Sequence, residues 1–144
     1  MKKLFSNLKL LCLMALALVA TCCFSSCGGK GQGEVLHQEE KMIVISVLEA
    51  EEGATLKSVI DAMVEEGDFT YEEDGSGLIT TINGYTATGS EYWGLYASDN
   101  DYANTEWGTA DYNGTTYGSA MFGYTTLPVV EGGVYIWKIT IMAW

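Results

Sequence analysis

The chain has 144 residues, room for a single domain, and it carries 19 acidic residues against seven lysines and no arginine. Its formal net charge of −12 offers no cationic surface to a phosphate backbone, which excludes nucleic-acid binding. The same acidity repels anionic lipid, so contact with a membrane must come from an anchor and not from the domain.

Residues 1–26 have the layout of a bacterial lipoprotein signal peptide. A start with three lysines precedes an apolar run over residues 10–20, which is shorter than the roughly 20 residues that cross a bilayer. The four residues that end at Cys27, F-S-S-C, resemble a lipobox, so Cys27 is the predicted lipid-modified residue. Cys22 is the rival position, and both cleavage without a lipid and retention as a membrane anchor stay open. We therefore expect a protein of the bacterial cell envelope, exposed outside the cytoplasm.

Beyond Cys27 the chain has no cysteine, which excludes a disulfide framework and a cysteine metal site there. The 19 acidic residues stand against four lysines in this part, a formal charge of −15. Residues 27–40 are rich in glycine and polar side chains and are interpreted as a flexible tether. The tether contains His37, the single histidine, which would be alone as a metal ligand.

The predicted domain, residues 41–144, begins with a β-branched apolar strand over residues 41–48. Thr55 is a candidate N-cap for a helix over residues 56–66, whose apolar residues recur every three or four positions, and Gly67 suits a left-handed C-cap. Strands are expected at residues 69–73, 78–82 (before an Asn83-Gly84 turn), 92–98 and 134–144.

In the last strand the apolar stripe from Tyr135 to Ile141 should face the core, while Lys138 and Thr140 should face water. Between the last two strands, residues 98–119 form a long Tyr- and Gly-rich insertion without periodicity, and such insertions are usually functional. The pattern indicates an α+β fold, with one helix on a mixed sheet of four to five strands, and a ubiquitin-like β-grasp is the most economical arrangement.

Five segments carry a resemblance to a known family: T-L-K-S-V-I-D-A-M, G-D-F-T-Y-E, G-L-I-T-T-I-N-G, E-Y-W-G-L-Y and the ending I-T-I-M-A-W. In that order they resemble the C-terminal β-domain of transcobalamin and intrinsic factor, and a bacterial domain of unknown function allied to it. The segment G-Y-T-T-L-P-V-V-E-G-G fits the pattern that such bacterial domains show before the last strand. The resemblance implies a β-grasp fold.

The resemblance also implies a ligand, cobalamin or a similar small molecule, although no cofactor is required. In the vertebrate carriers this domain covers one side of cobalamin, and the matching positions here are Trp93, Gly94, Leu95, Ala120, Met121 and Phe122. A corrin is an apolar disc rimmed by amides, so an aromatic face beside exposed backbone groups would suit it. The carriers also use a helical barrel, which this chain lacks, so half of such a site should bind weakly.

Other interpretations of the same residues stay open. Trp93 could be a core aromatic, and Trp107 with the tyrosines of the insertion could form a surface for a protein or glycan partner. A third possibility is a hard cation such as Ca²⁺ held by oxygen ligands of the insertion, namely Ser98, Asp99, Asn100, Asp101, Asn104 and Glu106, although their spacing does not match a helix-loop-helix site. No catalytic constellation is evident, because the domain lacks cysteine and offers no base beside its hydroxyl groups, so we do not expect an enzyme.

Overall fold

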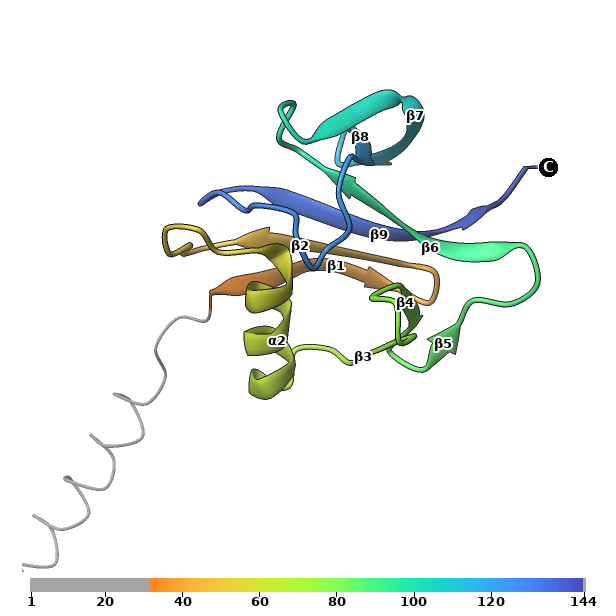
Figure 1. The fold of residues 1–144 in the computed structure, drawn as a ribbon, viewed down its shortest axis with the longest axis horizontal. Helices are drawn as coiled ribbons and strands as arrows, with labels where there is room; N and C mark the ends of the chain where they lie inside the picture. Colours follow the sequence, from red (N-terminus) through yellow and green to blue (C-terminus); the bar gives the residue numbers. More distant parts are fainter. Residues whose placement is uncertain (1–31, 144) are drawn as a thin grey trace, which may run out of the picture. The chain divides into compact units, whose positions relative to one another are not determined.

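The computed structural model describes residues 32–143, which fold mainly as β-structure (Figure 1). A six-stranded antiparallel sheet has the order β1-β2-β9-β6-β8-β7, and a second sheet has the order β3-β4-β5. The strands are β1 Gly33–Glu39, β2 Met42–Val47, β3 Tyr71–Glu73, β4 Ile79–Ile82, β5 Tyr85–Thr86, β6 Glu91–Ala97, β7 Ala103–Tyr112, β8 Thr115–Ala120 and β9 Val134–Ile141. Within residues 32–143 there is one helix, α2, at Leu56–Glu66.

The predicted β-grasp, one helix on a mixed sheet of four to five strands, is wrong. Every strand pair of the larger sheet is antiparallel, and the sheet has six strands. Two stretches expected to lie outside the sheet supply the additional strands, the tether (β1) and the Tyr- and Gly-rich insertion (β7 and β8). The stretch from β3 to β5 forms a small sheet of its own and does not extend the main one.

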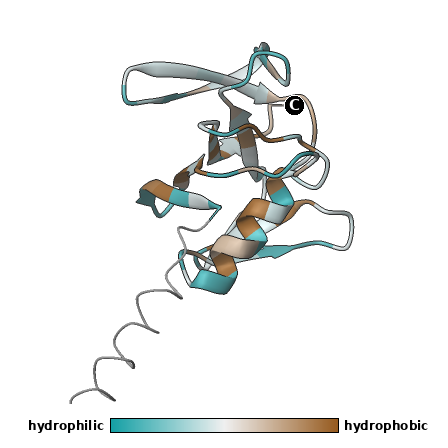
Figure 2. Ribbon diagram, turned by 90° about the vertical axis from the view of Figure 1, so that its left-hand side faces the viewer, coloured by the Kyte–Doolittle hydropathy of each residue, from teal (hydrophilic) through white to brown (hydrophobic). Residues whose placement is uncertain are grey.

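The helix α2 is confirmed with the predicted bounds. Its apolar positions are buried, and bands of hydrophobic and hydrophilic residues alternate along it (Figure 2). Gly67 ends the helix in the left-handed region, at φ 86°. Thr55 makes no side-chain cap, because the first two helical N–H groups already have partners: those of Leu56 and Lys57 donate to the carbonyls of Leu127 and Tyr124.

The strand β1 lies where the sequence predicted a tether. It pairs with β2 along its length and starts at Gly33, where a Cβ would lie 2.7 Å from the Met63 Sδ of the helix. A larger residue at this position would require the Met63 side chain to move, so glycine favours this close approach of the backbone to α2. Because β1 is an edge strand with one partner, it needs little apolar patterning, and this explains why its polar sequence did not indicate a strand.

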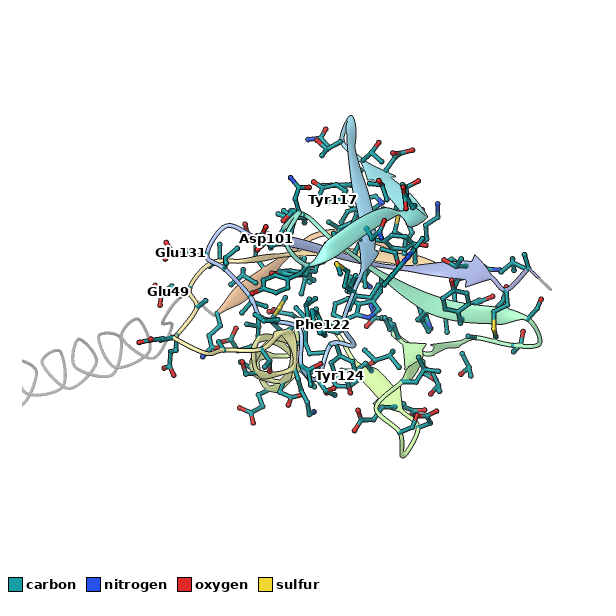
Figure 3. The ribbon with its side chains drawn as sticks, turned by 45° about the horizontal axis from the view of Figure 1, so that its top comes forward. Glu49, Asp101, Tyr117, Phe122, Tyr124 and Glu131 are labelled. Atoms are coloured by element: carbon teal, nitrogen blue, oxygen red, sulfur yellow. The ribbon has the colours of Figure 1, made fainter. Side chains whose placement is uncertain are left out.

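The main core lies between the larger sheet, α2 and the small sheet. Its buried members come from each of these elements, and they include Ile45, Val59, Ile82 and Trp137. The segment after β8 closes this core, since Tyr124 and Leu127 are buried in it and their carbonyls bind the start of α2. Figure 3 labels Phe122 and Tyr124 on this segment.

A second, smaller core lies on the opposite face of the sheet, the face on which Lys138 is exposed as predicted and Thr140 is half-buried. It contains Val44, Tyr96, Ala110, Tyr117 and Ile136, all buried. The β7–β8 hairpin covers this face with Ala110 and Tyr117, so the insertion is structural along part of its length. At the hairpin's end the Tyr112 hydroxyl lies 3.5 Å from the Leu36 carbonyl of β1, so the curved sheet brings its two edges together.

Candidate functional site

The topology places the two predicted ligand-binding segments beside each other. Strand β6 pairs with β8 only at Tyr96↔Ser119 and Ala97↔Gly118. Continuing this antiparallel register would set Leu95 opposite Ala120, but the pairing stops and the chain turns away through Met121 and Phe122. Two segments 25 positions apart in the sequence therefore meet where β8 ends.

Trp93 and Gly94 are buried in this arrangement. The Trp93 side chain belongs to the main core at 3% exposure, and its ring packs edge-on against Tyr85 with centroids 6.0 Å apart. Its indole N–H is buried without a hydrogen-bond partner among residues 32–143. At Gly94 a Cβ would lie 2.8 Å from the Thr140 Oγ1, so this glycine permits close packing of β6 and β9. The Trp93 ring is thus unavailable as a ligand platform.

The other predicted positions form an apolar surface. Met121 and Phe122 are exposed at 43% and 47%, while Leu95 and Ala120 are half-buried. Tyr102 packs edge-on against Phe122 with centroids 6.0 Å apart, and its carbonyl accepts a hydrogen bond of 2.8 Å from the Met121 N–H. We call Tyr102, Ala120, Met121 and Phe122 the Phe122 patch. The backbone of the patch is held by the hydrogen bond from Met121 to Tyr102, while the side chains of Met121 and Phe122 remain exposed.

The pairing of β6 with β9 fixes the direction of its backbone groups beside this patch. Ser98 N–H donates to the Val134 carbonyl and Met142 N–H donates to the Ser90 carbonyl, so even-numbered β6 residues turn their backbone groups toward β9. The backbone groups of Trp93 and Leu95 consequently point to the opposite side, where β8 ends. An apolar surface beside the edge of a strand is a suitable place for an amphipathic ligand.

Trp107 lies in a bulge that the sequence did not indicate. The tryptophan is 60% exposed, and residues 105–108 of β7 have no counterpart between Ser119 and Gly118 of β8. The Asn104 Oδ1 accepts a hydrogen bond of 2.8 Å from the Glu106 N–H and starts the bulge. Asn104, Gly108 and Gly118 are the residues from which the bulge could have been predicted. They indicate a bulge only once the pairing register of β7 and β8 is known.

Some side-chain oxygen atoms of the Tyr- and Gly-rich insertion accept hydrogen bonds from the backbone. The Ser98 Oγ accepts a hydrogen bond from the Val134 N–H, and the Asp99 Oδ1 accepts one from the Asp101 N–H, both near 3 Å. Within residues 32–143 no group of three or more His, Cys, Asp or Glu side chains converges on a point that could hold a metal ion. The hard-cation hypothesis therefore has no geometric support in the described residues.

Two polar clusters connect the small sheet to its neighbours. Lys57 of α2 pairs with Asp61 at 3.0 Å and donates to the Tyr71 hydroxyl at 3.1 Å, and the bonds to Tyr71 and Asp61 raise the pKa of the lysine. Burial raises the pKa of the Tyr71 hydroxyl, which donates to Asp61. Lys41 and Glu91 form a similar cluster with Tyr85. These contacts lie between elements and serve to dock them.

Two open hollows lie elsewhere on the surface. One, of about 480 Å³, is lined by Gln38, Glu39, Glu40, Asn83, Gly84 and Tyr85. The other, of about 290 Å³, lies at the start of α2 and includes Glu51 and Glu52. Neither contains a predicted ligand-binding residue. Both are open to solvent and include acidic residues, whereas small-molecule sites are usually lined predominantly by hydrophobic side chains.

Comparisons with protein-family models, with curated proteins and with solved structures give no match to this chain. The described part of the chain, residues 32–143, has no helix long and apolar enough to cross a membrane. The predicted lipidation site, Cys27, lies outside the described residues.

Proposed function

We propose that this chain is a lipid-anchored binding module outside the cytoplasm, which holds a flat amphipathic small molecule, in the first instance a corrinoid, on the Phe122 patch. The observation that supports this proposal most strongly is the exposure of Met121 and Phe122 at the point where β8 separates from β6. The proposal takes Trp93 as a support beneath the site and not as a contact, because its ring is buried.

The chemistry of the patch fits one face of such a ligand. A disc with an apolar face can pack on the Phe122 ring and the Met121 thioether, which adapts to irregular surfaces. Amides at the rim of the ligand can reach the backbone groups of β6 beside Leu95. The tethered position of a lipoprotein domain would keep the ligand at the cell surface, without any membrane contact by the acidic domain itself.

The open shape of the patch sets the expected affinity. Pockets for small molecules usually bury about 70–90% of the ligand surface, whereas an exposed patch covers one face at most. We therefore expect weak binding by this chain alone, with a Kd of about 10 µM to 1 mM. A partner protein that covers the second face would tighten the complex.

The experiment is an isothermal calorimetric titration of residues 28–144 with cyanocobalamin and, separately, with cobinamide. Phe122→Ala should weaken binding at least about tenfold, because an aromatic contact surface is lost. Leu78→Ala is the matched control, since Leu78 is an equally exposed apolar side chain, at 50%, in a turn of the small sheet, and it should leave the Kd unchanged. Absence of heat up to about 1 mM ligand, or equal weakening by both variants, would overturn the proposal.

A further inference from the structure

The bulge in β7 is built to hold one side chain in solvent. Residues 105–108 form the bulge between two consecutive residue pairs of the β7–β8 ladder, and Trp107 is the third of these four residues. At Gly118, across the ladder, a Cβ would lie 3.0 Å from the Asn104 carbonyl carbon and the Thr105 nitrogen. Gly108 follows Trp107 with φ +142°, a conformation that side chains disfavour. A bulge held in this way re-aims a side chain, as bulges next to functional sites do.

Among residues 32–143, Trp107 belongs to neither hydrophobic core and forms no aromatic pair. Its 60% exposure contrasts with Tyr117 of the same hairpin, which is 8% exposed in the second core (Figure 3). An exposed tryptophan forgoes the burial that makes aromatic side chains stabilising, and tryptophan is among the residues that dominate binding energy at interfaces. The bulge therefore presents a contact residue.

The charges around Trp107 indicate what it contacts. Asp101, Glu106 and Asp111 are exposed on or next to the hairpin, and residues 103–120 contain no lysine, arginine or histidine. The nearest basic side chains are His37, which packs against Tyr112 at the end of the hairpin, and Lys138, which is exposed on the same face of β9 as Ile136. Glu106 directly precedes the tryptophan. A partner surface with positive charge is attracted to this field, and one with negative charge is repelled.

We propose that the β7 bulge is a docking point for a cationic protein segment, in which an arginine stacks on the Trp107 ring and pairs with the Glu106 carboxylate. Arginine suits both contacts, because its planar guanidinium stacks on aromatic faces and forms two parallel hydrogen bonds with a carboxylate. This surface is separate from the Phe122 patch in its residues and in the chemistry that it recognises.

The test uses the full chain in mild detergent, titrated with an eight-residue peptide of alternating arginine and glycine at about 150 mM salt, where surface charges are screened beyond about 8 Å. Binding should weaken at least tenfold in Trp107→Ala and be partly restored in Trp107→Phe. It should also weaken in Glu106→Gln but not in Glu52→Gln, which removes an equal charge from the loop before α2. A lysine-glycine peptide should bind more weakly than the arginine peptide.

Three outcomes would overturn this proposal. The first is equal binding of the arginine peptide by the parent chain and Trp107→Ala, and the second is an equal loss in Glu106→Gln and Glu52→Gln, which would show diffuse attraction only. The third is binding of an uncharged oligosaccharide such as cellohexaose in place of the peptide, with loss in Trp107→Ala, which would identify a glycan surface. Circular dichroism of each variant controls for folding. Corrinoid titration of Trp107→Ala should match the parent chain, so this proposal can fail independently of the one for the Phe122 patch.

Discussion

Single carboxylates in the turns of this chain hold the backbone through their hydrogen bonds. The Asp74 Oδ1 accepts bonds from the Ser76 hydroxyl at 2.6 Å, the Ser76 N–H at 2.9 Å and the Leu78 N–H at 3.1 Å. These bonds, with the Ser76 hydroxyl as the largest contribution, lower the pKa of Asp74. An aspartate in this role fixes the turn between β3 and β4 by binding its own backbone.

The lowered pKa of Asp74 predicts a pH-dependent contribution to stability. A carboxyl group whose folded pKa is below its usual 3.8 stabilises the fold above that pH, and the contribution disappears as the pH falls through the folded value. The parent chain should therefore be more stable than Asp74→Asn at pH 6, and the difference should shrink as the pH falls below 3.8. Urea unfolding at several pH values measures the difference. A difference that did not change with pH would contradict the assignment.

At the scale of elements, the β7–β8 hairpin carries one aromatic residue that is buried and another that is exposed to solvent. Tyr117 points into the second core, while Trp107 points to solvent from the bulge. The hairpin also ends the sheet at β7, and β1 ends it at the other side. Both edge strands contain a register shift, around Leu36 and over residues 105–108, and such bulges discourage pairing with a further strand.

This division predicts opposite stability effects on the same hairpin. Tyr117→Ala should lower the free energy of unfolding by about 3 kcal/mol, because it leaves a cavity beside Val44 and Ile136. Trp107→Ala should change it by less than about 0.5 kcal/mol, since an exposed side chain leaves no cavity. Guanidinium unfolding of both variants checks this. If Trp107→Ala destabilised the chain as strongly as Tyr117→Ala, Trp107 would be a structural residue and the docking proposal would lose its basis.

Local features of the fold were predictable from sequence, and the assembly of the sheet was not. The helix and its Gly67 cap depend on neighbouring residues, as does the Asn83-Gly84 turn, where both residues have positive φ. The insertion gave no clear period-two signal, because residues 105–108 leave the ladder and interrupt the alternation within β7. The burial of Trp93 depends on contacts such as that with Tyr85 on the small sheet, which no local pattern specifies.

The same contrast applies to the candidate site. Three residues of the Phe122 patch, Ala120, Met121 and Phe122, came from a resemblance between segments, whereas Tyr102 and the closeness to β6 came only with the structure. Which of the six predicted residues are accessible is a property of the whole molecule, because it depends on how the segment after β8 crosses the core. The sequence could therefore predict which segments form the site. It could not distinguish the buried residues, Trp93 and Gly94, from the exposed Met121 and Phe122.

At the scale of the whole molecule, charge is the dominant property. Residues 32–143 contain all 19 acidic residues and three lysines, and two of these lysines, Lys41 and Lys57, are already paired with Glu91 and Asp61. The remaining carboxylates repel one another across the surface. Such self-repulsion favours solubility and disfavours the compact state.

Added salt should therefore stabilise this protein. Raising sodium chloride from about 10 mM to about 150 mM shortens the screening length from about 30 Å to about 8 Å, so repulsion between distant carboxylates weakens. A gain of about 0.5–1 kcal/mol would raise the Tm by roughly 2–8 °C in a domain of about 100 residues. The two exposed ion pairs lose little in return, because such pairs contribute at most about 1 kcal/mol. Differential scanning calorimetry at pH 7 measures the shift, and an equal concentration of sucrose in low salt controls for effects unrelated to charge. A Tm that fell with salt would mean that the ion pairs contribute more to stability than the repulsion between carboxylates removes.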